Sequence, residues 1–400
     1  MTGTGRLRLL VVNWLDGKNP RAGGAEVHLH EVFGRLARRG HGVTILASGW
    51  PGLAASEEWD GLRIFRSGRR YTFGLTAPGT YRRHLAKEPF DVVVEDLNKV
   101  PMFTPGWTGA RRHAFIVHHL FGATAFAAGN PVLAGATWLL ERTVPRLLHG
   151  RPCVAVSPST RDDLIARGVD PEYVDVIPNG VTLSPAQRGD RFPTPTGLYL
   201  GRLAPYKGLD LALRAVARAR EQGVRLELVV AGKGEDRSRL EEVARRLDLA
   251  SQVRFAGHVS EDEKRRLMEG AWFHVYPSPK EGWGLSNLEA AERSTPAIVS
   301  DSPGLRDTVQ VEPGRETGVI VPHGDVDALA RAMVDLTDPG TRERMGRNAR
   351  AFAESLSWDR VADQYEAWLV TVSSSPLRRK APAVPSSDLT SSNTREIRIR

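Results

Sequence analysis

The chain has 400 residues, of which 41% are hydrophobic, so it is long enough for two separately packed domains. Its single cysteine, Cys153, excludes an internal disulfide and a thiolate metal cluster, and it fits a reducing cytoplasm. The formal net charge of +8 would permit a nucleic acid, an anionic lipid or a phosphorylated small molecule as a partner.

The ends of the chain narrow these options. An apolar run near the N-terminus is closed by Asn13 and Asp16, too early for a signal peptide, and no apolar run reaches the length of a membrane span. Six basic and only two acidic residues lie between positions 371 and 400, in a Ser- and Pro-rich segment that we expect to be disordered from residue 372 onward. The remainder is mildly basic and has no zinc-finger or RNP motif, so we expect no nucleic acid partner.

The first 180 residues alternate between apolar runs and amphipathic segments of helical period. This alternation predicts a parallel sheet covered by helices on both faces. The strands are expected at 7–12, 43–47, 62–65, 91–95, 114–118, 153–156 and 173–177, and the helices at 24–39, 78–87, 131–149 and 158–167.

A polar, Pro-containing segment at 181–196 then predicts a linker. A second round of alternation follows in residues 197–356, and an amphipathic helix is expected at 357–371. The fold class is therefore α/β, with two doubly wound, Rossmann-like domains facing each other across a cleft. The second-domain strands are expected at 198–200, 226–230, 253–255, 273–276, 297–299 and 318–321.

The most informative segment is WFHVYPSPKEGWGLSNLEAA, residues 272–291, which predicts a strand, a glycine-containing loop and the start of a helix. Glu281 lies in the loop and Glu289 on the second turn of the helix, so both carboxylates can lean toward the space above the strand end. The backbone N–H groups of Gly284, Leu285 and Ser286 would open into the same space, where they suit a phosphate. Carboxylates accept hydrogen bonds from hydroxyls, and backbone amides donate them to phosphoryl oxygens. A site that offers both groups matches a nucleotide sugar.

The longer segment EGWGLSNLEAAERSTPAIVSD resembles the EGFGLPxLEAMAxGTPVVxS segment of retaining family-4-type glycosyltransferases, including the two glutamates eight residues apart. This resemblance implies the GT-B fold, with an acceptor-binding domain at 1–180, a donor-binding domain at 197–356 and a final helix that crosses back onto the first domain. It also implies transfer of a sugar from a nucleotide diphosphate sugar to a hydroxyl with retention. Glu289 would bind the ribose and Glu281 the sugar hydroxyls.

Three further motifs resemble parts of the same family. The family's GG-x-E loop is matched at Gly23 and Gly24, which would lie beside the donor diphosphate or an acceptor phosphate, although an ordinary strand-to-helix turn would have the same spacing. The segment GRLAPYKG resembles GRLxxxKG, so Arg202 and Lys207 would neutralise the diphosphate leaving group. Gly232 matches a glycine beside the donor; a dinucleotide site is not predicted, since the full Rossmann fingerprint is lacking.

The segment FIVHHLFG, residues 115–122, places two histidines at a predicted strand end. It resembles the family's VxxxHG strand end, which implies that His118 contacts the donor sugar and shares the acceptor proton, with His119 as the alternative. A hydrogen-bonded structural histidine is the plainer interpretation of either residue.

Residues 114–140 contain no charged side chain, and Arg142 and Arg146 follow them. An exposed apolar face edged by arginines would suit an anionic membrane and a lipid-linked acceptor, but we expect this segment to be first-domain core. Asp325 and Asp327 form an Asp-x-Asp pair, of which Asp325 is expected to cap a helix, so we predict no metal and no cofactor.

The predicted protein is thus a cytoplasmic glycosyltransferase, with peripheral attachment to the inner face of the cell membrane left open. A small molecule or a lipid-linked compound could supply the acceptor hydroxyl. A non-catalytic nucleotide-sugar-binding protein and a membrane-surface adaptor that uses the basic tail remain as alternatives. The sequence does not specify the donor base, the sugar or the acceptor.

Overall fold

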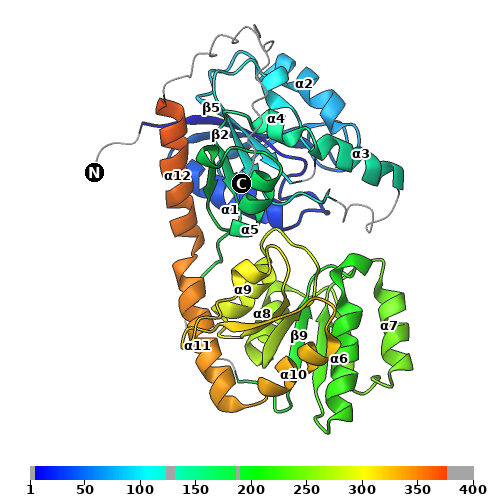
Figure 1. Cartoon of the computed structure of the whole chain (residues 1–400). Helices are drawn as coiled ribbons and strands as arrows, with labels where there is room; N and C mark the ends of the chain where they lie inside the picture. The colour runs from blue at the N-terminus through cyan, green and yellow to red at the C-terminus, as the bar shows by residue number, and fades with distance from the viewer. Residues whose placement is uncertain (1–4, 99, 123–130, 186–189, 376–400) are drawn as a thin grey trace, which may run out of the picture.

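The structure is a computed structural model that describes residues 5–98, 100–122, 131–185 and 190–375. It has two α/β domains, one stacked on the other, and a C-terminal helix α12 that runs along the first domain (Figure 1). Both the predicted fold class and the crossing helix are confirmed. The predicted disorder of the tail concerns residues that lie almost entirely outside the described ranges; α12 itself continues to Ser374, three residues beyond its predicted end.

The first domain is built on an eight-stranded sheet in the order β3-β4-β2-β1-β5-β6-β7-β8, parallel except for the edge pair β3 and β4. Its predicted strands are confirmed, because apolar runs such as that of β1 are buried on both faces of the sheet. The elements are β1 (Arg8–Val12), α1 (Gly24–Arg38), β2 (Gly42–Ser48), β3 (Ser56–Trp59), β4 (Leu62–Ser67), α2 (Phe73–His84), β5 (Val92–Leu97), β6 (His113–Val117), α3 (Pro131–Glu141), α4 (Val144–Leu148), β7 (Cys153–Ala155), α5 (Pro158–Ala166) and β8 (Val174–Val176).

Two helix predictions in this domain were wrong in detail. The helix expected at 131–149 is divided into α3 and α4, because Pro145 has no N–H to donate to the carbonyl of Glu141 and is accommodated only in the first turn of a new helix. The helix expected from residue 78 already begins at Phe73, which is fully buried beneath it together with Ala77. Burial of this apolar turn outweighs the preference of Pro78 for a helix start.

The second domain has a fully parallel six-stranded sheet in the order β11-β10-β9-β12-β13-β14. From β9 the strand order runs toward one edge of the sheet, and from β12 it runs toward the other, so the order reverses between these two strands. The loops that follow β9 and β12 flank this point at the edge facing the first domain, where open α/β sheets bind ligands. The elements are β9 (Thr196–Leu200), α6 (Leu209–Glu221), β10 (Glu227–Ala231), α7 (Arg237–Arg246), β11 (Val253–Gly257), α8 (Glu261–Gly270), β12 (Phe273–Tyr276), α9 (Leu285–Glu292), β13 (Ala297–Ser300), β14 (Gly318–Val321), α10 (Val326–Asp335) and α11 (Pro339–Ser355), after which α12 (Trp358–Ser374) returns to the first domain.

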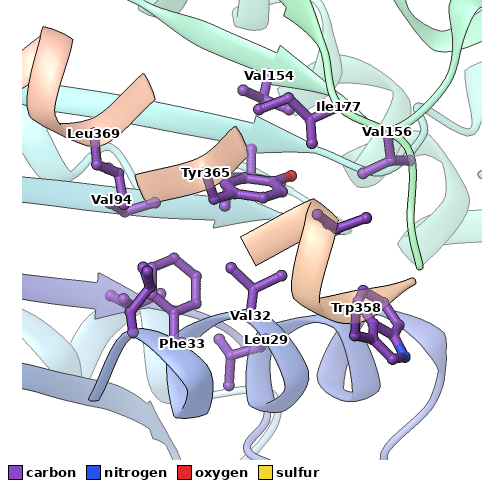
Figure 2. Close-up of a cluster of buried hydrophobic side chains, with 14 of the residues drawn as sticks. Leu29, Val32, Phe33, Val94, Val154, Val156, Ile177, Trp358, Tyr365 and Leu369 are labelled. Atoms are coloured by element: carbon purple, nitrogen blue, oxygen red, sulfur yellow. The ribbon is translucent and has the colours of Figure 1, made fainter. Parts of the chain in front are cut away.

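Helix α12 is part of the first domain's core. Figure 2 shows the Tyr365 ring between α1 and the sheet, with Leu369 and Trp358 on the same face of α12. Tyr365 and Leu369 are fully buried, and burial of the Leu369 side chain alone stabilises the docked helix by about 1.5–3 kcal/mol. Ion pairs from Arg35 to Asp359 and from Arg39 to Glu366 lie along its edge.

The chain passes between the two domains twice, and the two connecting segments are hydrogen-bonded to each other. Val181 donates its N–H to the Leu356 carbonyl and accepts one from Trp358, so the start of the linker pairs with the start of α12. Gly180 lies directly against the Trp358 ring, where a Cβ would come within 2.8 Å of ring atoms. The two segments that connect the domains are therefore packed against each other.

Candidate active site

Helix α9 presents its N-terminus toward the first domain. Its N-cap, Gly284, has a φ of 82°, and an added Cβ would lie 2.9 Å from Leu305 Cδ2, so glycine is needed at this turn. No side chain of the described residues caps this helix, which leaves the amides of Gly284, Leu285 and Ser286 available to an anion. The strand, loop and helix predicted at 272–291 are thus confirmed.

Lys207 and Glu281 form a buried ion pair in front of this helix start. The Lys207 ammonium lies 2.5 Å from Glu281 Oε1, and it also lies over the rings of Tyr206 and Tyr276, at 5.0 and 5.4 Å from their centroids. Burial alone would lower the pKa of Lys207, but the Glu281 carboxylate, with Tyr206, raises it above its usual value. Lys207 is therefore a charged, desolvated cation.

Arg202 lies close to Lys207 but in a different environment. Its guanidinium is 5.8 Å from the Tyr206 ring and donates to the Tyr206 hydroxyl at 3.4 Å, while the side chain as a whole is exposed. The two predicted cations thus share one aromatic neighbour. Lys207 is held in place by burial, whereas Arg202 can reorient toward a ligand.

The glycine pair of the first domain lies opposite α9. Gly24 approaches Leu285 so closely that an added Cβ would lie 3.1 Å from Leu285 Cδ1. The amide of Gly23 is already used, since it donates to Glu26 Oε2 at 2.7 Å, and the other Glu26 oxygen accepts from Asn98. Gly23 therefore shapes the loop, and Gly24 sets the close approach between the domains.

The two histidines after β6 differ in environment. His118 is buried, and its Nε2 lies 2.8 Å from Asp96 Oδ1. His119 is partly exposed and lines a hollow of about 390 Å³ between the domains. Other residues around this hollow are Ser159, Asp163, Lys280, Glu281 and Arg306.

The domains are held together beside this hollow. Lys280 reaches Asp163 at 3.3 Å, and the Ser159 amide donates to Asp307 at 3.1 Å. A Cβ on Gly282 would come within 2.8 Å of the His118 carbonyl oxygen, so the glutamate loop of the second domain touches the histidine segment of the first. This contact places Glu281 near both histidines.

Glu289 does not share a described hollow with Glu281, contrary to the expectation that both carboxylates would lean into one space. It accepts from Lys264 of α8 at 3.0 Å and lines a separate hollow of about 400 Å³ with Val27 and Glu31 of α1. Lys207 holds Glu281 on one side of the α9 start, and Lys264 draws Glu289 to the other.

Gly232 has a local structural role. An added Cβ would lie 1.8 Å from the Gly201 carbonyl oxygen, and the Gly232 N–H donates to the Gly257 carbonyl at 2.7 Å. The strand ends of β9, β10 and β11 require this close packing. A donor could contact Gly232 only through its Cα or its carbonyl, since its amide is occupied.

The Asp-x-Asp pair is part of a helix start and a surface ion pair. Asp325 accepts the Ala328 N–H at 2.8 Å, which confirms the predicted N-cap, and Asp327 pairs with Arg218. A different group, formed by the buried His28, Asp96 and His118, brings three potential ligand atoms within 4.8 Å of one another. The sequence reasoning missed His28 and Asp96. The acidic end of the strand VVVEDL was a signal for a residue at the sheet edge, but its contact with His118 follows from the pairing of β5 with β6.

Comparisons with known proteins agree with this architecture. A family model described as Glycosyltransferase Family 4 matches residues 22–184, and one described as Glycosyl transferases group 1 matches residues 187–352. The glycogen synthase of Mycobacterium tuberculosis is 28% identical, over 89% of this chain and 92% of its own length. The D-inositol 3-phosphate glycosyltransferase of Streptomyces bingchenggensis is 32% identical, over 52% of this chain and 50% of its own.

Solved structures share the fold. Sucrose-phosphate synthase from Thermosynechococcus elongatus superposes with a TM-score of 0.74 at 22% identity, covering 91% of this chain and 98% of its own. The Anabaena protein Alr3699/HepE, solved with UDP and glucose, gives a TM-score of 0.70 at 16% identity, covering 92% and 100%.

Two Rossmann-like domains and a helix that crosses back onto the first give this chain the GT-B fold, which these solved structures share. The two matching family models together extend over both domains. The chain belongs to the family 4, group 1 glycosyltransferases. Among the helices that the structure describes, none combines the length and apolarity needed to cross a bilayer.

Proposed function

We propose that the chain transfers a sugar from a nucleotide diphosphate sugar to an acceptor hydroxyl, with retention at the anomeric carbon. The observation that supports this most is the buried Lys207–Glu281 pair, because Glu281 lies just before the uncapped N-terminus of α9. A desolvated cation and free N–H groups stabilise charge that develops on a diphosphate leaving group far better than they would in water.

Each residue has a distinct role in this proposal. Lys207, Arg202 and the amides of Leu285 and Ser286 bind the diphosphate, and Glu281 accepts hydrogen bonds from the sugar hydroxyls. Glu289 would bind the ribose after leaving Lys264. Retention follows if the acceptor attacks from the leaving-group side and a diphosphate oxygen takes its proton, as the family resemblance implies.

The choice between the two histidines is also part of the proposal. We assign contact with the sugar to His118, as the family resemblance implies. His119 lines the hollow that Glu281 also lines, so it is available to the acceptor. His118→Ala is expected to weaken turnover with every acceptor, whereas His119→Ala should change the preference among acceptors. Equal effects of the two variants on all acceptors would contradict this division.

The identities of the donor and the acceptor are also part of the proposal. UDP in the Alr3699/HepE structure makes a uridine diphosphate sugar the first donor to test. The named relatives are a glycogen synthase and a D-inositol 3-phosphate glycosyltransferase, so a hydroxyl-rich acceptor for glycoconjugate, glycolipid or secondary-metabolite synthesis is proposed here.

The test combines binding with turnover. A thermal-shift panel of UDP, GDP, ADP and TDP identifies the base, since a ligand that binds the folded state raises its apparent stability by mass action. The matching UDP-, GDP-, ADP- or TDP-sugar is then assayed for transfer and for slow hydrolysis in water. Binding without either reaction would favour the non-catalytic sugar-nucleotide-binding alternative. EDTA should leave turnover unchanged, and a loss restored by manganese would contradict the predicted metal independence.

An apolar face on α3 supports peripheral membrane contact. The uncharged segment 114–140 and the residues that follow it were expected to be core; this is right for α4, where Val144 and Leu148 are buried, but wrong for α3. Leu139 is 62% exposed, and Trp138 is also exposed beneath the Arg142 guanidinium, 4.3 Å from its ring centroid. Apolar side chains beside an arginine match an anionic lipid surface at the inner face of the cell membrane.

Vesicle co-sedimentation tests this contact. Vesicles with an anionic lipid should bind the full chain at low salt, and neutral vesicles should bind it less. The variant Trp138→Glu/Leu139→Glu should lose this binding while keeping turnover of a soluble acceptor. Absence of binding even at low salt would remove the membrane contact, and binding by the tail alone would favour the adaptor alternative.

A further inference from the structure

We propose that Asp96 is a positioning residue for His118: it holds the imidazole as the Nε2–H tautomer, so that only Nδ1 is presented to the ligand. This inference rests on the proposed function, in which His118 contacts the sugar. It concerns a residue outside the motifs that identify the family, and it assigns a purpose to a buried carboxylate that packing alone does not explain.

The hydrogen bond between the two residues defines the tautomer. Asp96 is fully buried at the end of β5, and its Oδ1 lies 2.8 Å from His118 Nε2, at the end of the neighbouring strand β6. In the proposed arrangement the Asp96 carboxylate accepts this hydrogen bond, so Nε2 carries the proton. Within the described residues, the second Asp96 oxygen has no hydrogen-bond partner, so His118 is the only group there that orients this carboxylate.

His28 blocks the other arrangement of the ring. Its imidazole meets the His118 ring edge-on, with centroids 5.1 Å apart and planes at 81°. Burial, and then His118, lower the pKa of His28 well below its usual value, so it is a neutral neighbour that adds no competing charge. A rotation of the His118 ring would have to displace this fully buried side chain.

The crossing helix completes the cluster. Tyr365 of α12 lies edge-on to His28 with centroids 5.1 Å apart, and Trp358 lies 6.1 Å from it. The His118 imidazole is thus in contact with Asp96 of β5 and His28 of α1, and α12 packs behind His28. With Nε2 occupied, a neutral His118 offers Nδ1 as an acceptor, which can take a hydrogen bond from a sugar or acceptor hydroxyl.

The histidine tautomer can be measured directly by ¹⁵N NMR of the full chain labelled at histidine, with His118→Gln used for assignment. The wild-type spectrum should show His118 protonated at Nε2 only. In Asp96→Asn, whose side chain can accept or donate, a mixture of both tautomers is expected. A wild-type Nδ1–H signal, or an unchanged pure Nε2–H signal in Asp96→Asn, would overturn the inference.

Glu95→Gln is the matched control. Glu95 is the preceding residue on the same strand, equally buried, and accepts from Met102 and Thr104 rather than from a histidine. Asp96→Asn should lower kcat at least tenfold, while Glu95→Gln should leave kcat within threefold and the His118 tautomer unchanged. An equal loss of kcat in both variants would reduce Asp96 to a structural role and overturn the inference.

Two further readouts keep the inference separate from the proposed function. If no variant, wild type included, transfers any sugar, the proposed function fails while the NMR measurement still decides the tautomer. Elemental analysis of the purified chain should find no stoichiometric metal. A zinc ion that is present in the wild type and lost in Asp96→Asn would make Asp96 a ligand and overturn its positioning role.

Discussion

At the scale of single residues, the site depends on charges removed from water. Lys207 and Glu281 have side chains that are 9% and 15% exposed, so removing one partner would leave the other buried without its counter-ion. Such a single variant loses stability and activity together, which confounds the two. Removing both charges together separates the effect on activity from the effect on stability.

The double variant Lys207→Met/Glu281→Gln is therefore predicted to fold with a thermal midpoint close to the wild type, since no unpaired charge remains. Turnover of the donor should fall at least about 100-fold, or about 2.7 kcal/mol, because the groups that stabilise the diphosphate charge are gone. Arg344→Ala, which breaks the Arg344–Glu316 ion pair elsewhere in the second domain, is the control. Turnover within tenfold of the wild type in the double variant would count against Lys207 and Glu281 as catalytic groups.

A buried histidine predicts acid sensitivity. Burial lowers the pKa of His274 to about 4, from about 6.5 in the unfolded chain, so the unfolded state binds the extra proton between these values. The contribution of His274 to stability is complete above pH 6.5 and is lost as the pH falls toward 4, by roughly 2 kcal/mol at pH 5. His274→Leu should show a smaller drop in its urea midpoint between pH 7 and pH 5. A parallel drop in both proteins would contradict this assignment.

At the scale of elements, α9 combines a tight turn with an anion site. Gly284→Ala is predicted to cost about 1–3 kcal/mol of stability, because its φ of 82° is strained for alanine and its Cβ would press on Leu305. Donor binding should weaken as well, since the amides of this turn would shift. Ala290→Gly, at a buried position in the same helix, is the comparison: it should lower the urea midpoint without changing the Kd for the nucleotide. A loss of binding in both variants would make general helix stability the cause.

The sequence could specify most of these elements. Apolar runs bounded by turn residues predicted every strand except β3, whose polar sequence SEEW forms an antiparallel edge that is only partly buried. The motifs that contain Lys207 and Glu281 predicted that both residues lie in one site. Motif spacing could not reveal the contact between Asp96 and His118, because that contact depends on β5 and β6 being neighbours in the sheet.

At the scale of the whole molecule, the first domain, the second domain and α12 meet around one region. Gly24 and the histidine segment lie against the α9 loop, and the Lys280–Asp163 pair holds the domains together at its edge. The cysteine count excluded an internal disulfide, but composition does not show how the domains are joined, because that depends on contacts between residues far apart in the sequence, such as Gly180 and Trp358.

The packing of Gly180 predicts a coupling between the crossing helix and the domains. Gly180→Ala would place a Cβ 2.8 Å from the Trp358 ring, so the linker and the start of α12 should separate. We expect a loss of about 1–3 kcal/mol in stability and faster proteolysis near residue 357. Gly106→Ala, where an added Cβ meets no atom within 4 Å and the backbone is not in the left-handed region, is the control. Equal effects would show that the Trp358 contact contributes nothing.

The central claim is tested most directly by a crystal structure of the full chain with a bound nucleoside diphosphate. The ligand is uridine diphosphate, or another nucleoside diphosphate if the binding panel selects it. The account predicts that the phosphate oxygens accept hydrogen bonds from Lys207 and from the amides of Leu285 and Ser286. A diphosphate bound away from these three groups, for example beside Lys264 on the far side of α9, would contradict it.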